Sequence, residues 1–368
     1  MLVDKITLKD IGLFDTEESA GLISHLNFCK TNGGKEQLDQ YLAQPLNSIE
    51  AIEKRQKAIA VFVNEIDFIH EMKITNGTTL VIEKFFGTAF KPIPTQISYL
   101  GAYWYQYVNG ADYALLKYSL EHLILFYENL NNWLVVFERK NENPIIANLV
   151  QNIKKLVQHS ALANLNTQTT LANPQKLLAL AYFFRNHYKN NTIQLLQHYY
   201  DLDAYYSMAT AVKKFNFVFP TWINSERPLL EVVSGIHPLV PNPIDNTISL
   251  SSQNNLFFLT GANMAGKSTF IKTIGIIIYL SHIGIGSPAK KVTLSLFDGL
   301  ITNLTIADNV VKGESYFFNE VQRIKNTIEK IIDGKKYFVL IDELFKGTNI
   351  QDAMKCSSTV IEGLQNLR

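Results

Sequence analysis

The sequence predicts an α/β P-loop domain that follows an all-α domain, and three observations support this expectation. Apolar residues up to about residue 228 recur mainly at helical spacing. From Leu229 onward, short apolar runs alternate with helical patterns, which is typical of a mostly parallel sheet covered by helices. A glycine-rich segment at 260–269 joins one of these runs to a helix. We therefore expect a helical domain at 1–228 and a nucleotide-binding domain at 229–368.

The helical domain is expected to contain several short helices and two long ones. Gly33-Gly34 is expected to break the chain before a helix at 35–43. Long helical patterns cover 112–139 and 175–215. A helix of about 28 residues spans about 40 Å. That length suits a lever arm, although the same periodicity also fits the core of a bundle.

The second domain is expected to use Asn255–Thr260 as the strand before the glycine-rich segment, with an apolar helix after it. Other short strands are expected at Leu229–Val233, Ile283–Gly286, Val292–Leu294, Leu300–Leu304 and Lys336–Ile341. Further helices are expected from about Gly313 to Asp333 and from about Ile350 onward. Such a sheet binds its ligand at the C-terminal ends of the parallel strands.

The glycine-rich segment has the spacing of a phosphate-binding loop, with Gly261, four residues, and then Gly266-Lys267-Ser268. Glycines let backbone N–H groups point at phosphate oxygens, and the following helix adds its positive dipole end. Lys267 can reach the β- and γ-phosphates of ATP, and the Ser268 hydroxyl can ligate Mg²⁺. The residues expected to contact the nucleotide are Gly261, Ala262, Asn263, Met264, Ala265, Gly266, Lys267, Ser268 and Thr269.

Asp342 and Glu343 form a second candidate motif, because they follow the apolar run at 336–341. Asp342 at a strand end can hold Mg²⁺, usually through water, and Glu343 can orient or deprotonate an attacking water. An acidic pair after a strand is common in any sheet. Together with a phosphate-binding loop in the same predicted sheet, it favours ATP hydrolysis over simple nucleotide binding.

Composition limits the possible partners. With 47% hydrophobic and 18% charged residues the chain is globular, and a net charge of +1 gives no basic footprint, so any nucleic-acid contact must come from local patches or encirclement. Cys29 and Cys356 lack metal-ligand spacing. With no signal-peptide pattern and no apolar stretch long enough to span a bilayer, we expect a cytoplasmic protein without membrane contact.

The aromatic residues at 103–107 can stack on bases, but such clusters more often form a core or an interface.

Three segments of the second domain resemble the ATPase domain of the MutS mismatch-repair family: Thr260–Thr269, Ser315–Glu320 and Asp342–Thr348. Weaker resemblance covers 25–60 and 200–228, and Gly235-Ile-His237-Pro238 resembles the family's Gly-Arg-His-Pro. The resemblance extends over most of the chain and is strongest at 229–353. It implies an ABC-type ATPase domain preceded by a helical core and lever domain.

The resemblance also implies a homodimer with composite ATP sites. Ser315 would contact the γ-phosphate bound by the partner subunit, Asp308 would respond to the nucleotide state, and His237 would lie at the nucleotide. Gly347-Thr348 would lie at the dimer interface. The family passes double-stranded DNA between its lever arms, which implies mismatched or branched DNA and other repair proteins as partners.

Several positions depart from the family pattern. Ile236 replaces an arginine, Tyr316 a threonine and Asn309 a second aspartate, and Pro243 or Ile244 stands where an aromatic residue stacks on adenine. The sequence ends before the family's switch histidine and C-terminal dimerising helices. The first 24 residues are too short for the mismatch-reading domain. We therefore expect a short form with a C-terminally incomplete ATPase domain.

Three functional hypotheses remain open at this point. The first is a MutS-like DNA-dependent ATPase that binds mismatched or distorted DNA and couples ATP binding and hydrolysis to clamp movement in mismatch repair. The second is an ATP-switched module for branched DNA or a ribonucleoprotein, without mismatch specificity. The third is a structural dimer whose ATPase activity has decayed.

Overall fold

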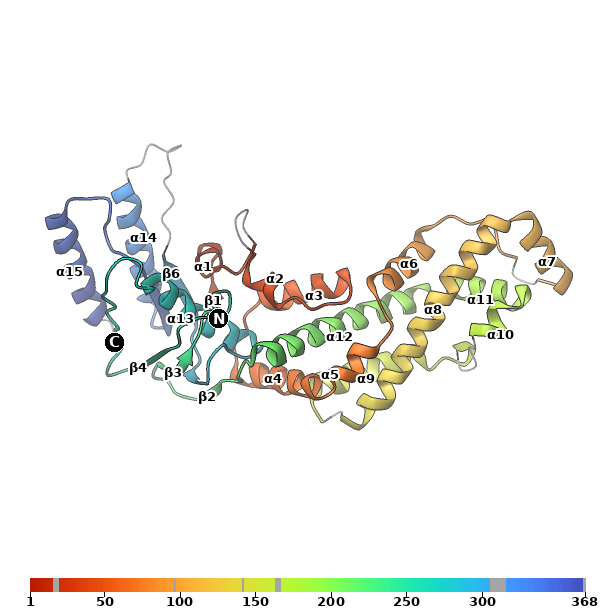
Figure 1. Ribbon diagram of the computed structural model, residues 1–368, viewed down its shortest axis with the longest axis horizontal. Helices are drawn as coiled ribbons and strands as arrows, with labels where there is room; N and C mark the ends of the chain where they lie inside the picture. The colour runs from red at the N-terminus through yellow and green to blue at the C-terminus, as the bar shows by residue number, and fades with distance from the viewer. Residues whose placement is uncertain (16–19, 95–96, 141, 163–166, 305–315, 367–368) are drawn as a thin grey trace. The chain divides into compact units, whose positions relative to one another are not determined.

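The protein mixes helices and strands and is predominantly helical, as expected (Figure 1). The computed structural model describes residues 1–15, 20–94, 97–140, 142–162, 167–304 and 316–366. Contacts divide the chain into two compact units, which we call the sheet unit and the helical unit. The sheet unit comprises residues 1–27, 41–56 and 211–368, and the helical unit comprises residues 28–40 and 57–210. The predicted boundary between functional domains at 228/229 stays a prediction.

The helical unit contains the two long helices α8 (Gly110–Phe137) and most of α12 (Lys189–Phe215). Its other elements are α3 (Asn32–Ala43) and α4 (Ile49–Asn64), both shared with the sheet unit, α5 (Ile66–Glu71), α6 (Asn76–Gly87), α7 (Tyr99–Val108), η1 (Glu138–Lys140), α9 (Pro144–Val157), η2 (Ser160–Leu162), α10 (Thr167–Leu171) and α11 (Pro174–Asn186). The single helix expected at 175–215 is wrong, because α11 and α12 are separate. The N–H groups of His187 and Tyr188 both donate to Phe183 O, at 2.9 and 3.1 Å, and this closes α11.

Asp203 of α12 fixes the start of α3 within the helical unit. Its carboxylate accepts hydrogen bonds from the N–H groups of Lys30 and Thr31, both at 2.9 Å, and from the Thr31 hydroxyl at 2.6 Å. The predicted chain break at Gly33-Gly34 is wrong, because both glycines lie in the first turn of α3. A Cβ at Gly34 would overlap Asp203, and one at Gly33 would overlap the Tyr200 ring. The glycines therefore allow close helix packing.

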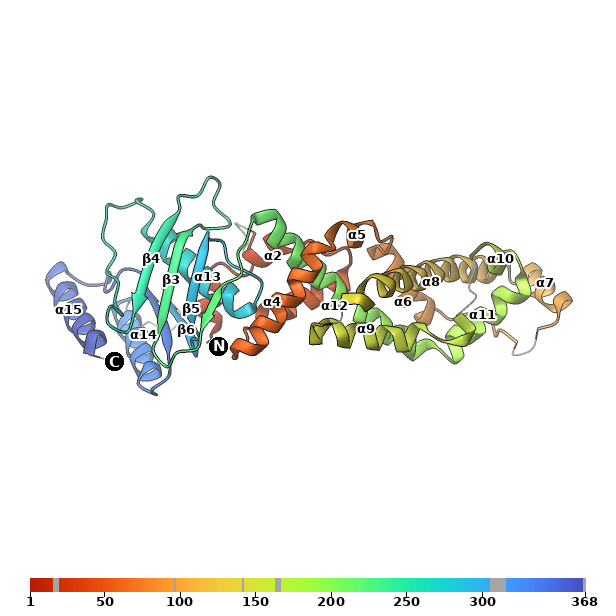
Figure 2. The ribbon, with the colours of Figure 1, turned by 90° about the horizontal axis from the view of Figure 1, so that it is seen from below.

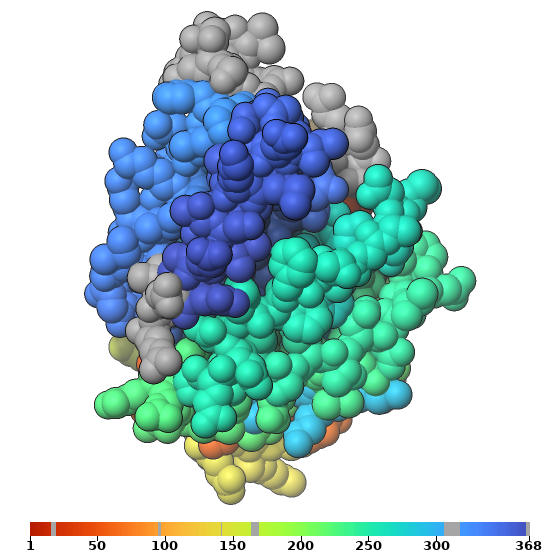
Figure 3. Space-filling view, turned by 90° about the vertical axis from the view of Figure 1, so that its left-hand side faces the viewer, coloured from red at the N-terminus to blue at the C-terminus, as the bar shows by residue number. Residues whose placement is uncertain are grey.

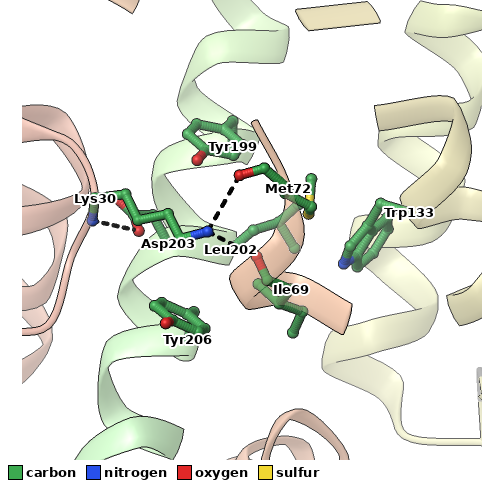
Figure 4. A pocket seen from close by; sticks show the side chains of 8 residues that line it. All are labelled: Lys30, Ile69, Met72, Trp133, Tyr199, Leu202, Asp203 and Tyr206. Carbon is green, nitrogen blue, oxygen red and sulfur yellow. Dashed lines mark hydrogen bonds between the residues drawn. The ribbon is translucent and has the colours of Figure 1, made fainter. Parts of the chain in front are cut away.

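Figure 4 shows a small cavity beside this contact, between Lys30, Trp133, Asp203 and Tyr206. The Lys30 ammonium donates to the carbonyls of Ile69 and Met72, at 2.8 and 3.2 Å, and so binds the C-terminal end of α5. The cavity holds about 10 Å³, close to the space of one water molecule. It is too small for an organic ligand.

The sheet unit contains two sheets (Figure 2). The first is wholly parallel, in the order β1 (Leu2–Val3), β6 (Gly299–Asn303), β7 (Tyr337–Ile341). The second is mixed, in the order β2 (Thr221–Ile223), β5 (Lys291–Ser295), β3 (Leu229–Gly235), β4 (Asn246–Ser251). The other helices of the sheet unit are α1 (Lys5–Asp10), α2 (Leu22–Leu26), α13 (Lys267–Ile283), α14 (Tyr316–Ile331) and α15 (Ile350–Asn366).

Two of the expected strands are wrong. Residues 255–260 form no strand, and Phe257 and Phe258 are 50% and 70% exposed. None of the described strands pairs with this segment, so its backbone lacks the ladder that a strand requires. Residues 283–286 instead end α13, where Gly284 caps the helix with a φ of 82°. The left-handed conformation at that position suits glycine.

Helix α13 is the centre of the sheet unit. Every residue from Thr273 to Ile283 is buried, and the side chains of Ile274, Ile277 and Ile278 pack against Val232 and other apolar residues of β3 and β5. This confirms that the apolar run at 274–280 is a buried helix. Within the described ranges, no helix is both long enough and apolar enough to cross a membrane.

Candidate nucleotide site

The glycine-rich segment folds back over Lys267, the first residue of α13. The Lys267 ammonium donates to the carbonyl oxygens of Gly261 and Ala262, at 2.8 and 3.0 Å. Gly266 precedes the helix with a φ of 89°, and Met264 has a φ of 67° with a fully exposed side chain. The β4–α13 connection shares an exposed face of the sheet unit with α15 (Figure 3). The loop is therefore open to a ligand from solvent.

Ser268 and Asp342 lie together although 74 positions separate them in sequence. The Ser268 hydroxyl donates a hydrogen bond to the Asp342 carboxylate. Asp342 directly follows β7, and its N–H donates to Asn303 O at the end of β6, at 3.1 Å. The contact therefore places both side chains at the C-terminal end of the parallel sheet, where ligands of α/β proteins bind.

The oxygen pair of Ser268 and Asp342 fits a magnesium ion. Mg²⁺ prefers oxygen ligands and usually keeps several waters while using one or two protein groups plus phosphate oxygens. Across the described residues, no group of three or more His, Cys, Asp and Glu side chains is arranged to hold a metal on its own. A sparse oxygen pair beside the glycine-rich loop would suit an ion that arrives together with a phosphate ligand.

Glu343 lies next to this pair on a strained turn. Its φ is 51°, which is uncommon for a residue other than glycine. Its partly exposed carboxylate forms an ion pair with Lys346, three residues later. The Glu343 carboxylate, predicted to act as general base, is therefore accessible to solvent, and the Lys346 ammonium balances its negative charge.

His237 lies in the turn after β3, in surroundings that favour its neutral form. Burial lowers its pKa, and the positive charge of Lys272 on α13 lowers it further. Its Nδ1 accepts a hydrogen bond from the N–H of Leu239, at 3.3 Å. Ile244, at the predicted adenine-stacking position, is 83% exposed. A neutral ring can offer a nucleotide a hydrogen bond without adding charge.

The remaining predicted site residues are placed only in part. Ser315 and Asp308 lie outside the described residues. Helix α14 begins at Tyr316, and the N–H of Gly347 donates to Glu320 of that helix, at 3.0 Å. The structure therefore links helix α14, which carries residues 316–320 of the MutS-like segment Ser315–Glu320, to the loop after Glu343.

Glu320 is not among the site residues predicted from the sequence, where it appears only as the end of the MutS-like segment Ser315–Glu320. It is 2% exposed, and its carboxylate accepts hydrogen bonds from the N–H groups of Lys346 and Gly347. A signal was present, because Glu320 shares the helical spacing of the apolar residues Phe317 and Ile324. A carboxylate on a buried helix face needs hydrogen-bond donors.

The aromatic cluster of α7 divides between core and surface. Tyr105 is buried, whereas Tyr103, Trp104 and Tyr107 are 44%, 68% and 84% exposed. These three side chains are therefore not part of the core of the helical unit. Their contribution to binding stays untested.

The fold and the site together define a class of protein, namely a mixed α/β protein with a candidate nucleotide site at the end of a parallel sheet. Residues 257–368 match the family model described as MutS domain V. The C-terminal part of the chain is therefore similar to the MutS family, in the region where its sequence motifs indicated the resemblance.

Two curated relatives are similar to part of this chain. The DNA mismatch repair protein MutS of Petrotoga mobilis is 32% identical over 168 residues, which is 45% of this chain and 20% of the relative. MutS of Bacillus subtilis is 32% identical over 175 residues, 46% of this chain and 20% of the relative. The matched part thus spans about a fifth of the length of these relatives.

Proposed function

We propose that this chain is a MutS-like ATPase that binds ATP and Mg²⁺ in an ABC-type P-loop domain. The observation that carries the proposal is the contact between Ser268 and Asp342 beside the Lys267 loop. It joins the two nucleotide motifs at one point. Residues 229–368 would form this domain, and residues 1–228 the core and lever domain.

Each site residue has a role in this proposal. Backbone N–H groups of 261–269 bind phosphate oxygens, Lys267 neutralises the β- and γ-phosphates, and Ser268 and Asp342 hold Mg²⁺. Glu343 exchanges its ion pair with Lys346 for the attacking water, which it orients or deprotonates. Ser315 contacts the nucleotide of the partner subunit in a homodimer, and His237 borders the bound nucleotide.

We further propose that the ATPase acts on DNA in the cytoplasm. The curated relatives are named DNA mismatch repair proteins, which supports mismatched or distorted double-stranded DNA as the ligand and mismatch repair as the process. ATP binding and hydrolysis would then drive movement of a clamp around the DNA.

Two substitutions test the nucleotide chemistry. Glu343→Gln is expected to leave ATP affinity nearly unchanged and to lower turnover by about 100-fold, because it removes the general base. Lys267→Ala is expected to weaken ATP binding itself. Equilibrium ATP binding and steady-state phosphate release measure the two effects. Exposed Lys355→Ala on α15 is the control. Unchanged turnover in Glu343→Gln would refute the mechanism.

A further inference from the structure

Glu320 carries a buried carboxylate that the proposed reaction does not use. Its oxygens accept from Lys346 N–H at 2.9 Å and from Gly347 N–H at 3.0 Å. Hydrogen bonds from backbone N–H groups to a carboxylate are charge-assisted and stronger than neutral ones. Two such bonds at these lengths hold a short stretch of backbone in one place.

The stretch held in this way belongs to a strained loop. Glu343 and Phe345 both have left-handed φ values, 51° and 59°, although neither is glycine. Such residues cost on the order of 1–3 kcal/mol each and persist only where surrounding contacts fix them. The Phe345 ring packs on Phe317, one turn before Glu320, with ring centroids 5.8 Å apart. Helix α14 therefore fixes the loop twice, through a ring and through a carboxylate.

The same helix begins directly after Ser315 in sequence. Helix α14 thus connects residues 316–320 of the MutS-like segment to the loop that carries Glu343.

We propose that Glu320 is a positioning residue for Glu343. By binding the N–H groups of Lys346 and Gly347, it holds the loop in the conformation from which Glu343 reaches the attacking water. This inference rests on the proposed hydrolytic role of Glu343.

The role of Glu320 can be tested with a substitution that keeps the size and shape of its side chain. A cavity of about 10 Å³ lies between Asn303, Glu320, Arg323 and Glu343, which leaves room for about one water molecule. Glu320→Gln keeps the shape of the side chain. Its amide N–H₂ group cannot accept a hydrogen bond, so it opposes one of the two backbone donors.

The experiment compares Glu320→Gln, Glu343→Gln and the double variant in the full chain. We expect Glu320→Gln to keep ATP affinity within about twofold and to lower kcat by about tenfold or more, because small misplacements of reacting groups are costly. In the Glu343→Gln background, Glu320→Gln should lower kcat by less than about twofold, since both changes act through one group. Glu329→Gln, an exposed residue of the same helix, is the matched control.

Hydrogen exchange provides a readout that does not depend on activity or on a folded variant. In the unaltered chain, the Lys346 and Gly347 amides should exchange at least about tenfold more slowly than unprotected amides, although both residues are exposed. Unprotected exchange there would overturn the inference. A Glu320→Gln variant with full kcat, while Glu343→Gln loses it, would also overturn the inference. If the unaltered chain showed no ATP turnover, that result would refute the proposed function and leave the hydrogen-exchange test of Glu320 in place.

Discussion

At the scale of single residues, buried carboxylates with backbone donors fix the positions where segments distant in sequence meet. Glu320 does this for the loop after β7, and Asp203 does it for the start of α3. Burial raises the pKa of Asp203 although donors from Lys30 and Thr31 oppose that shift. The cost of burying such a group is offset only while the donors stay in place.

Asp203→Ala is therefore expected to lower the free energy of unfolding by about 2–4 kcal/mol, because it leaves the Thr31 and Lys30 donors without their acceptor. Chemical denaturation followed by circular dichroism measures the change. Glu36→Gln, at an exposed position of α3, should change stability by less than about 0.5 kcal/mol. Equal stability of the two variants would contradict the anchoring role of Asp203.

At the scale of elements, α13 follows the glycine-rich loop at its start and is fully buried at its end. His282 near that end is completely buried, with Nδ1 donating to Ile278 O at 2.9 Å and Nε2 accepting from Phe297 N–H at 3.2 Å. The bond that Nε2 accepts requires the neutral ring, whereas Nδ1 donates in either protonation state. The pKa of His282 is lowered to about 4, mainly by desolvation and also by the charge of the Met1 amino group, while the hydrogen bond to Ile278 O and the charge of Asp298 oppose the shift.

The fold therefore loses stability in acid. In the unfolded chain the pKa of histidine is near 6.5, so the unfolded state binds a proton first as pH falls. The contribution of His282 is fully present above about pH 6.5 and is lost between there and pH 4, at about 3 kcal/mol or less. In thermal melts, His282→Gln should flatten the slope of Tm against pH in this window. His187→Gln, which changes an exposed histidine, should keep the slope of the unaltered chain.

At the scale of the whole molecule, a net charge of +1 means that overall attraction to DNA is weak. The proposed DNA contact then depends on local contacts, on the shape of the DNA and on the nucleotide state. The N-terminal residues also belong to the sheet unit, because β1 pairs with β6 and Asp10 accepts a hydrogen bond from the Thr302 hydroxyl at 2.7 Å.

We expect the chain to bind mismatched DNA more tightly than homoduplex DNA and to change this affinity when ATP is added. Fluorescence anisotropy with homoduplex, mismatched and four-way-junction DNA, at two salt concentrations, measures both effects and separates phosphate contacts from structure preference. Lys267→Ala should abolish the ATP effect and keep the nucleotide-free affinity. A preference for junctions would favour a branched-DNA module, and no binding in any state would refute the DNA part of the proposal.

The sequence by itself indicated the resemblance of the C-terminal part to MutS, and it predicted the long helix α8, the buried helix α13 and two candidate nucleotide motifs. These features depend on local spacing: a glycine loop before a helix, an acidic pair after an apolar run, and apolar residues at helical intervals. Each of them is encoded within about 30 neighbouring residues, so a linear pattern suffices to identify it.

Only the tertiary structure decided which distant residues meet. It brought Ser268 to Asp342 and Glu320 to Lys346 and Gly347, and it left 255–260 without a strand partner among the described strands. Hydrogen bonds of this kind join groups that are far apart in sequence. The residues around each group are the same whether or not the distant partner forms the bond, so the local sequence does not reveal the contact. The physical reason is that the cost of burying a carboxylate or leaving a strand unpaired is decided by three-dimensional neighbours.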